Sequence, residues 1–129
     1  MAFRRDPERA QARTGRWQRE DEATRLAVEV DQLRSLRIVI EEWRGDQLIS
    51  GARYTKHVIV SRAPARFEVP CGDPKCQEGG YDITDDLMRG LRARATSIEG
   101  QSECRGTIGD KFCDRVVKFA ATATYAASE

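Results

Sequence analysis

Several common features are missing from this sequence of 129 residues, and each absence excludes a class of protein. It contains no asparagine, so it has no acceptor for N-glycosylation. Its longest apolar runs, such as residues 58–60, are far too short to span a bilayer. Residues 1–15 also lack the apolar stretch of a secretory signal peptide. We therefore expect a cytoplasmic protein that has no membrane segment.

Sequence motifs of the common enzyme classes are also missing. There is no G-x-x-x-x-G-K phosphate loop, no dinucleotide-binding G-x-G-x-x-G, and neither H-E-x-x-H nor G-x-S-x-G. The single histidine, His57, is expected to be partly exposed on a strand, because histidine is usually of intermediate burial. Its local sequence context also suggests no Cys–His nucleophile pair. The adjacent acids Glu41 and Glu42, like Asp85 and Asp86, have no partner for acid–base chemistry. These absences predict a protein that is not an enzyme.

Charge is nearly balanced over the whole chain, with 22 basic and 21 acidic residues and a net charge of +1. No overall field therefore recruits nucleic acid or an anionic membrane. The first 20 residues are an exception, because they hold six arginines and only three acidic residues. Residues 1–15 also have few apolar side chains, which predicts a flexible basic tail. The remaining residues, 16–129, have a length that is typical of a single domain.

Hydrophobic periodicity predicts an N-terminal helix. Ala23, Leu26, Val30 and Leu33 recur at steps of three and four, which predicts a helix over residues 16–34. The same stripe fits the heptad spacing of a coiled coil, so a homodimer through helix 16–34 is possible.

The rest of the chain predicts a small antiparallel sheet and one inserted short helix, which together give an α+β fold. Alternating apolar and β-branched residues from Leu36 onward predict a strand that forms a hairpin with the strand over residues 52–60. After a break at two glycines, residues 82–92 predict a short helix with Asp82 or Thr84 as its cap. Further strands are expected at residues 66–69, 95–102 and 116–125.

Four cysteines are the most informative residues of the chain. Cys71 and Cys76 enclose four residues, of which Gly72, Asp73 and Pro74 are turn formers, and Cys104 and Cys113 enclose eight residues that include two glycines. Four thiolates that converge can bind zinc tetrahedrally, and no position then remains for water or substrate. In a cytoplasmic protein, paired cysteines are metal ligands or redox thiols before they are disulfides. We therefore predict a structural Zn²⁺ site that stabilises the domain over residues 16–129.

Other interpretations of the four cysteines remain open at the level of sequence. They include disulfides within each pair, a redox switch, unligated buried thiols and an iron–sulfur cluster. The arrangement resembles a zinc ribbon in the general sense that paired cysteines lie at hairpin tips. It differs from the common ribbon pattern in the C-x8-C spacing of the second pair and in the helix inserted between the pairs.

The leading functional hypothesis is a non-enzymatic, zinc-binding interaction module with an unidentified protein partner. The alternatives are a zinc ribbon that binds nucleic acid and a cysteine-based redox sensor. Basic side chains at the end of the inserted helix and around the second cysteine pair could contact phosphates. In the helix, complementation of the helix dipole explains the same arginines without a ligand. The possible nucleic-acid contacts are Arg89, Arg92, Arg105, Lys111 and Arg115.

Overall fold

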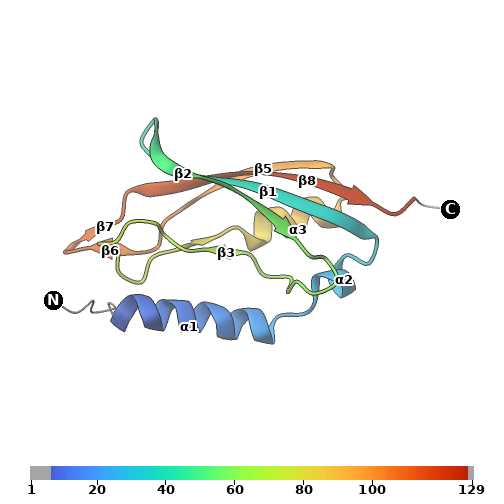
Figure 1. The fold of residues 1–129 in the computed structure, drawn as a ribbon, viewed down its shortest axis with the longest axis horizontal. Coiled ribbons are helices and arrows are strands. Elements are labelled where there is room, and N and C mark those ends of the chain that lie inside the picture. The colour runs from blue at the N-terminus through green and yellow to red at the C-terminus, as the bar shows by residue number, and fades with distance from the viewer. Residues whose placement is uncertain (1–6, 128–129) are drawn as a thin grey trace.

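A computed structural model of the chain describes residues 7–127, with side chains from residue 14 onward. It confirms a mixed fold of helices and strands with a small antiparallel sheet. The central sheet lies above α1 in Figure 1, with β3, β4 and the cysteine loops between them. The elements are α1 (Pro7–Glu22), α2 (Leu26–Glu29), β1 (Leu33–Arg44), β2 (Gln47–Val58), β3 (Glu68–Val69), β4 (Tyr81–Asp82), α3 (Thr84–Arg92), β5 (Ser97–Glu103), β6 (Thr107–Ile108), β7 (Lys111–Phe112) and β8 (Arg115–Tyr125).

The central sheet has the strand order β2-β1-β8-β5, and all neighbouring strands are antiparallel. One face of this sheet forms the core, because alternate side chains point to it. In β1 the even-numbered residues from Leu36 to Ile40 are buried, and in β8 the odd-numbered residues from Val117 to Ala123 are buried. The predicted hairpin between β1 and β2 is confirmed, and Gly45 permits its tight turn with a φ of +60°.

The inserted helix α3 confirms the helix predicted at residues 82–92. Its apolar side chains Leu87 and Leu91 are fully buried in the same core. Just before the helix, the Asp82 carboxylate accepts a hydrogen bond from the backbone N–H of Thr84 at 3.0 Å. The residue at the N-cap position is Ile83, between the two predicted cap residues. The helix connects β4, which follows the first cysteine pair, to β5, which precedes the second pair.

The helix predicted over residues 16–34 is wrong in its extent. α1 ends at Glu22, and the chain then becomes extended, because Arg25 forms a β-bridge with Pro64. A second backbone bond, from Ala65 N–H to Thr24 O at 2.7 Å, holds this segment in the extended form. Pairing with a distant segment therefore overrides the helical preference of the sequence.

The same break removes the basis for a homodimer through helix 16–34. A coiled-coil seam needs one continuous helix with its apolar stripe facing a second chain. Instead, Leu26 lies in the four-residue helix α2 with no exposed surface, and Leu33 lies in β1. Leu26, Val30 and Leu33 are buried in the core of this chain. These three residues of the stripe are thus buried against the chain itself.

The boundary predicted at residue 15 also differs from the structure. α1 begins at Pro7, so residues 7–15 of the predicted tail are helical, while residues 1–6 lie outside the described residues. Proline is well suited to the first position of a helix, because its fixed φ and missing N–H cost nothing there. The segment also contains alanine, arginine, glutamine and glutamate, which favour helices although they lack an apolar stripe.

Ion pairs to one buried carboxylate connect α1 with the rest of the domain. The Glu68 side chain is only 2% exposed and accepts two hydrogen bonds of 2.7 Å from Arg19 of α1. Arg66 and Arg105 each donate a further bond at 3.1 Å. Burial opposes ionisation of Glu68, but the three guanidinium groups outweigh it and lower its pKa to about 2. This cluster joins α1, β3 and the segment that follows Cys104.

Candidate metal centre

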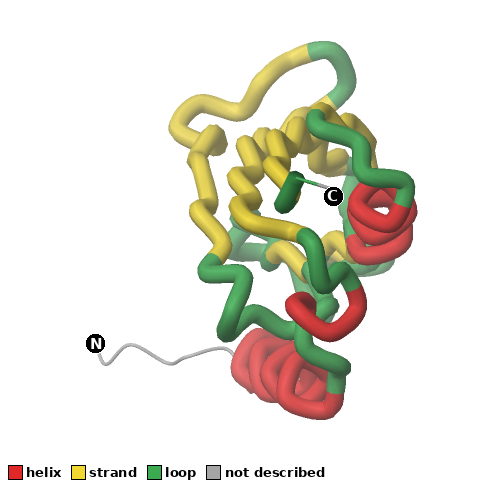
Figure 2. The backbone as a smooth tube through the Cα atoms, turned by 90° about the vertical axis from the view of Figure 1, so that its right-hand side faces the viewer, coloured by secondary structure: helices red, strands yellow, loops and turns green. Residues whose placement is uncertain are grey.

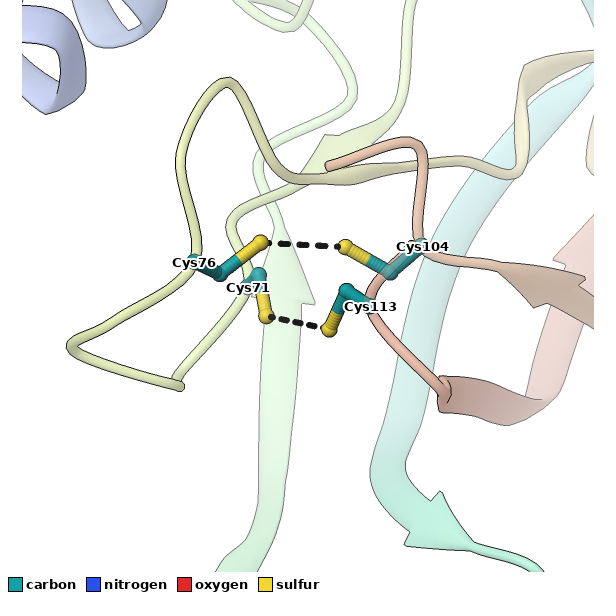
Figure 3. A group of neighbouring side chains, drawn as sticks. All are labelled: Cys71, Cys76, Cys104 and Cys113. Carbon is teal, nitrogen blue, oxygen red and sulfur yellow. Dashed lines mark hydrogen bonds between the residues drawn. The ribbon is translucent and has the colours of Figure 1, made fainter. Parts of the chain in front are cut away.

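The four cysteines come together in one buried cluster. Their Sγ atoms all lie within 4.8 Å of one another, and Figure 3 shows them converging from two loops. The Sγ atoms of Cys71 and Cys113 are 3.9 Å apart, and those of Cys76 and Cys104 are 3.6 Å apart. A tetrahedral ion with metal–sulfur bonds of about 2.3 Å would separate its sulfur atoms by about 3.8 Å. The four residues predicted from the sequence could therefore hold a metal ion.

The cysteines are all free thiols, and the close sulfur contacts run between the two sequence pairs. Both of these separations are far longer than a disulfide bond of about 2.05 Å, so these contacts are not disulfides. Because all four thiols are free, disulfides within each pair, one of the alternatives for this sequence, are also absent from this structure.

The first loop positions Cys71 and Cys76 through the side chain and backbone of Asp73. Cys76 N–H donates to the Asp73 carbonyl at 3.1 Å, and Lys75 N–H donates to the Asp73 carboxylate at 2.9 Å. The backbone N–H of Asp73 in turn bonds to the Cys71 sulfur and favours its ionised form. These bonds close a tight turn that places both thiols on the same side of the loop (Figure 3).

The second loop explains the unusual spacing of eight residues between Cys104 and Cys113. β6 and β7 pair within this loop as a small hairpin, and Gly109 at its turn has a φ of +64°. At the base of the hairpin, Cys113 N–H donates to the Gly106 carbonyl at 2.9 Å, which brings the two cysteines together. Gly106 N–H also donates to the Cys104 sulfur at 3.4 Å. In both loops, therefore, the sulfur of the first cysteine accepts a hydrogen bond from the backbone N–H of the second residue after it.

Direct backbone contacts hold the two cysteine loops against each other. Gln77 and Thr107 exchange two backbone hydrogen bonds, of 2.8 and 3.0 Å. Two glycines allow this close approach, because a Cβ atom at Gly79 or at Gly106 would lie 2.3 Å from the Cys76 sulfur. No larger side chain fits at either position without displacing a sulfur atom. The site is thus closed on this side by backbone.

A buried carboxylate beside the site anchors the first loop to the central sheet. The Glu42 carboxylate accepts hydrogen bonds from the Tyr81 hydroxyl at 2.8 Å, the Gly72 N–H at 3.1 Å and the Arg115 guanidinium at 3.4 Å. Arg115 also approaches the Asp73 carboxylate at 3.8 Å. Such outer contacts orient the ligands of metal sites in proteins. This network connects β1, β4 and β8 with the loop that carries Cys71.

Sequence reasoning missed the role of Glu42, although the sequence carries a signal for it. Glu42 has the same parity as the buried residues Leu36, Ile38 and Ile40, so strand alternation places it on the buried face. Arg115 likewise has the parity of the buried residues of β8. A carboxylate and a guanidinium in phase with the core on two strands predict a buried ion pair, since a lone buried charge is very unfavourable.

The thiols lack the features of a reactive cysteine. Hydrogen bonding with Cys104 and burial raise the pKa of Cys71, and burial raises the pKa of Cys76 to about 12. Reactive redox cysteines are exposed and have a lowered pKa, because the thiolate is the nucleophile. Without a cation, the buried thiols of Cys71 and Cys76 are therefore poor nucleophiles. The geometry does not favour the redox-sensor hypothesis.

The five basic residues predicted as possible nucleic-acid contacts do not form a free patch. Lys111 is exposed on β7, but each arginine pairs with a carboxylate of the same chain. Arg115 is only 12% exposed, so it lies inside the molecule and is unsuited to contact a phosphate. The pairs are Arg89 with Asp86, Arg92 with Glu29, Arg105 with Glu68 and Arg115 with Glu42.

Comparison of the chain with protein-family models, with curated proteins and with solved structures finds no match. Among the described residues, no helix is long and apolar enough to cross a membrane. The functional assignment therefore rests on the geometry of the chain's own residues.

Proposed function

We propose that this chain is a non-enzymatic zinc-binding module that acts by binding another protein. The observation that supports this most is the closure of the four-cysteine cluster, in which four buried Sγ atoms lie within 4.8 Å of one another. A zinc ion bound by four thiolates has no open position for water or substrate, so its role is structural. The surface that performs the function must then lie elsewhere on the molecule.

Zinc is the metal that we infer from the ligands. Soft thiolate ligands in a tetrahedral arrangement select zinc or iron–sulfur chemistry over harder cations. The two cysteine-bearing loops would hold the ion in the manner of a zinc ribbon, with one loop rigidified by the Asp73 turn and the other by the β6–β7 hairpin. The ion would connect segments on either side of α3 and stabilise a single domain. A reducing compartment such as the cytoplasm would keep the four thiols available.

Metal analysis of natively purified protein tests this proposal. We expect one zinc ion per chain, and we expect a chelator to remove the zinc together with the folded circular dichroism signal. Cys71→Ser should lose zinc, whereas His57→Ala, which removes the chain's single imidazole, should retain it. All four thiols should resist alkylation until the chelator is added. A folded, metal-free chain with four thiols that react at once would refute the proposal.

A further inference from the structure

β2 is the outermost strand of the central sheet, and its outer edge is unpaired. The strand order places β1 on one side of β2, and Figure 2 shows β2 at the periphery of the molecule. Within residues 7–127, the backbone of β2 forms no hydrogen bond with a segment other than β1. The five consecutive residues 53–57 are all exposed. Such an edge presents a row of unpaired N–H and C=O groups that another strand can join.

The charge along this edge is of one sign. Residues 47–67 contain no acidic residue, whereas the chain as a whole contains 21. On β2 the exposed basic side chains are Arg53 and Lys56, and His57 lies directly opposite the exposed Arg37 of β1. Glu41 of β1 contacts Arg53 at 3.5 Å, so one carboxylate already shows the kind of group that suits this edge.

The two faces of β2 differ in what they offer to an added strand. Residues 53, 55 and 57 lie opposite exposed or partly exposed residues of β1 and therefore share the outer face of the sheet. Tyr54 and Val58 lie opposite the buried Ile40 and Leu36, so they share the face of the core. Tyr54 keeps 44% of its surface exposed, which leaves an uncovered apolar surface beside the core. An added strand would therefore find Arg53 and His57 on the outer face, and the apolar surface of Tyr54 beside Lys56 on the face of the core.

We propose that the outer edge of β2 receives an extended, acidic segment of a partner protein by strand addition. This inference rests on the proposed protein-binding function and specifies the class of partner. A second copy of the chain is a poor occupant, because symmetric pairing would bring Lys56 and Arg53 close to like charges. The partner segment would carry carboxylates on the face shared with Arg53 and His57, and apolar residues on the face shared with Tyr54.

A peptide experiment on the full, zinc-loaded chain tests the inference. The probe is a short fluorescein-labelled peptide with alternating glutamates on one face and threonine and valine on the other. Its binding is measured by fluorescence anisotropy and by amide shifts in NMR spectra. We expect the amide shifts to concentrate on β2, and we expect a peptide of the same sequence with N-methyl groups on alternate amides to lose binding. Equal binding of the N-methylated peptide would overturn strand addition.

Charge variants provide the second arm of the test. Arg53→Glu should weaken binding of the acidic peptide by about fivefold, since it reverses a cross-strand charge pair on the outer face, and Lys56→Glu, which lies on the other face, should weaken it by less. Arg89→Glu reverses an exposed charge on α3, which contacts β5 at the opposite edge of the sheet, and should leave binding unchanged. Equal loss in all three variants, or displacement of the peptide by a DNA oligonucleotide, would contradict the inference. Zinc content is measured on the same samples. Loss of peptide binding at one zinc per chain counts against strand addition alone, whereas loss of zinc counts against the proposed zinc-binding function.

Discussion

Substitution of Gly106 by alanine should damage the metal site without disturbing the rest of the fold. A Cβ atom at this position would lie 2.3 Å from the Cys76 sulfur, 2.6 Å from the Gly79 Cα and 2.7 Å from the Gln77 carbonyl oxygen. Two of these three atoms belong to the backbone and cannot rotate away. The two loops must therefore separate, and the sulfur must move by about 1 Å, whereas metal–ligand distances tolerate only about 0.2 Å.

The expected effect follows from the loss of one of four ligands. Structural zinc sites bind with about 10–16 kcal/mol of free energy, so one ligand contributes about 3 kcal/mol. Gly106→Ala should thus weaken zinc binding by about a hundredfold, which competition with a chromophoric chelator can measure. The matched control is Gly109→Ala in the same loop, where the Cβ would meet nothing within 4 Å.

The control should separate steric displacement from backbone strain. Gly109 has a φ of +64°, so alanine there costs about 1–2 kcal/mol of stability, but it leaves the sulfur atoms in place. We expect Gly109→Ala to keep its zinc affinity within about threefold of the native chain. If Gly106→Ala also bound zinc as tightly as the native chain, the packing of the two loops described here would be incorrect.

Three further predictions concern the core, the ionic cluster and the network beside the site. Leu26→Ala should lower the free energy of unfolding by about 2–5 kcal/mol, whereas Val28→Ala, at a side chain that is 70% exposed, should change it by less than about 0.5 kcal/mol in denaturant titrations. The pKa of Glu68 is lowered from 4.5 to about 2 in the folded state, so ionised Glu68 stabilises the fold fully at a pH above 4.5. The difference in the free energy of unfolding between the native chain and Glu68→Gln should therefore vanish as the pH falls from 4.5 to about 2. A constant difference between the two proteins from pH 5 to pH 2 would contradict this. Tyr81→Phe should cost about 1–3 kcal/mol, because Glu42 loses a 2.8 Å hydrogen bond, while zinc stoichiometry should stay at one per chain. An unchanged stability would count against the network.

Local patterns were sufficient to predict the sheet and the inserted helix. Alternation from Leu36 to Ile40 and from Val117 to Ala123 reports which face of each strand is buried, and the structure confirms it. Each pattern depends only on residues close in sequence, whose geometry is set by the strand or helix repeat.

The N-terminal region could not be predicted in the same way. The stripe from Ala23 to Leu33 satisfies the helical repeat, but Arg25 pairs with Pro64, almost forty residues further along the chain. Nothing local in the sequence indicates that partner. The cluster of three arginines around Glu68 is hidden for the same reason, since its members come from three separate segments.

The cysteine site was predictable in its members and not in its geometry. The number of cysteines and the turn residues around Cys71 and Cys76 indicated a common site. The contacts of Cys71 with Cys113 and of Cys76 with Cys104 depend on the β6–β7 hairpin, which is too short to leave a clear pattern in the sequence.

X-ray absorption at the zinc edge of the native protein tests the central claim most directly. We predict a single shell of four sulfur atoms at about 2.3 Å, supplied by Cys71, Cys76, Cys104 and Cys113, with no nitrogen or oxygen neighbour. A mixed shell that contains nitrogen or oxygen would contradict the closed four-thiolate site, and so would a protein that folds with no bound metal.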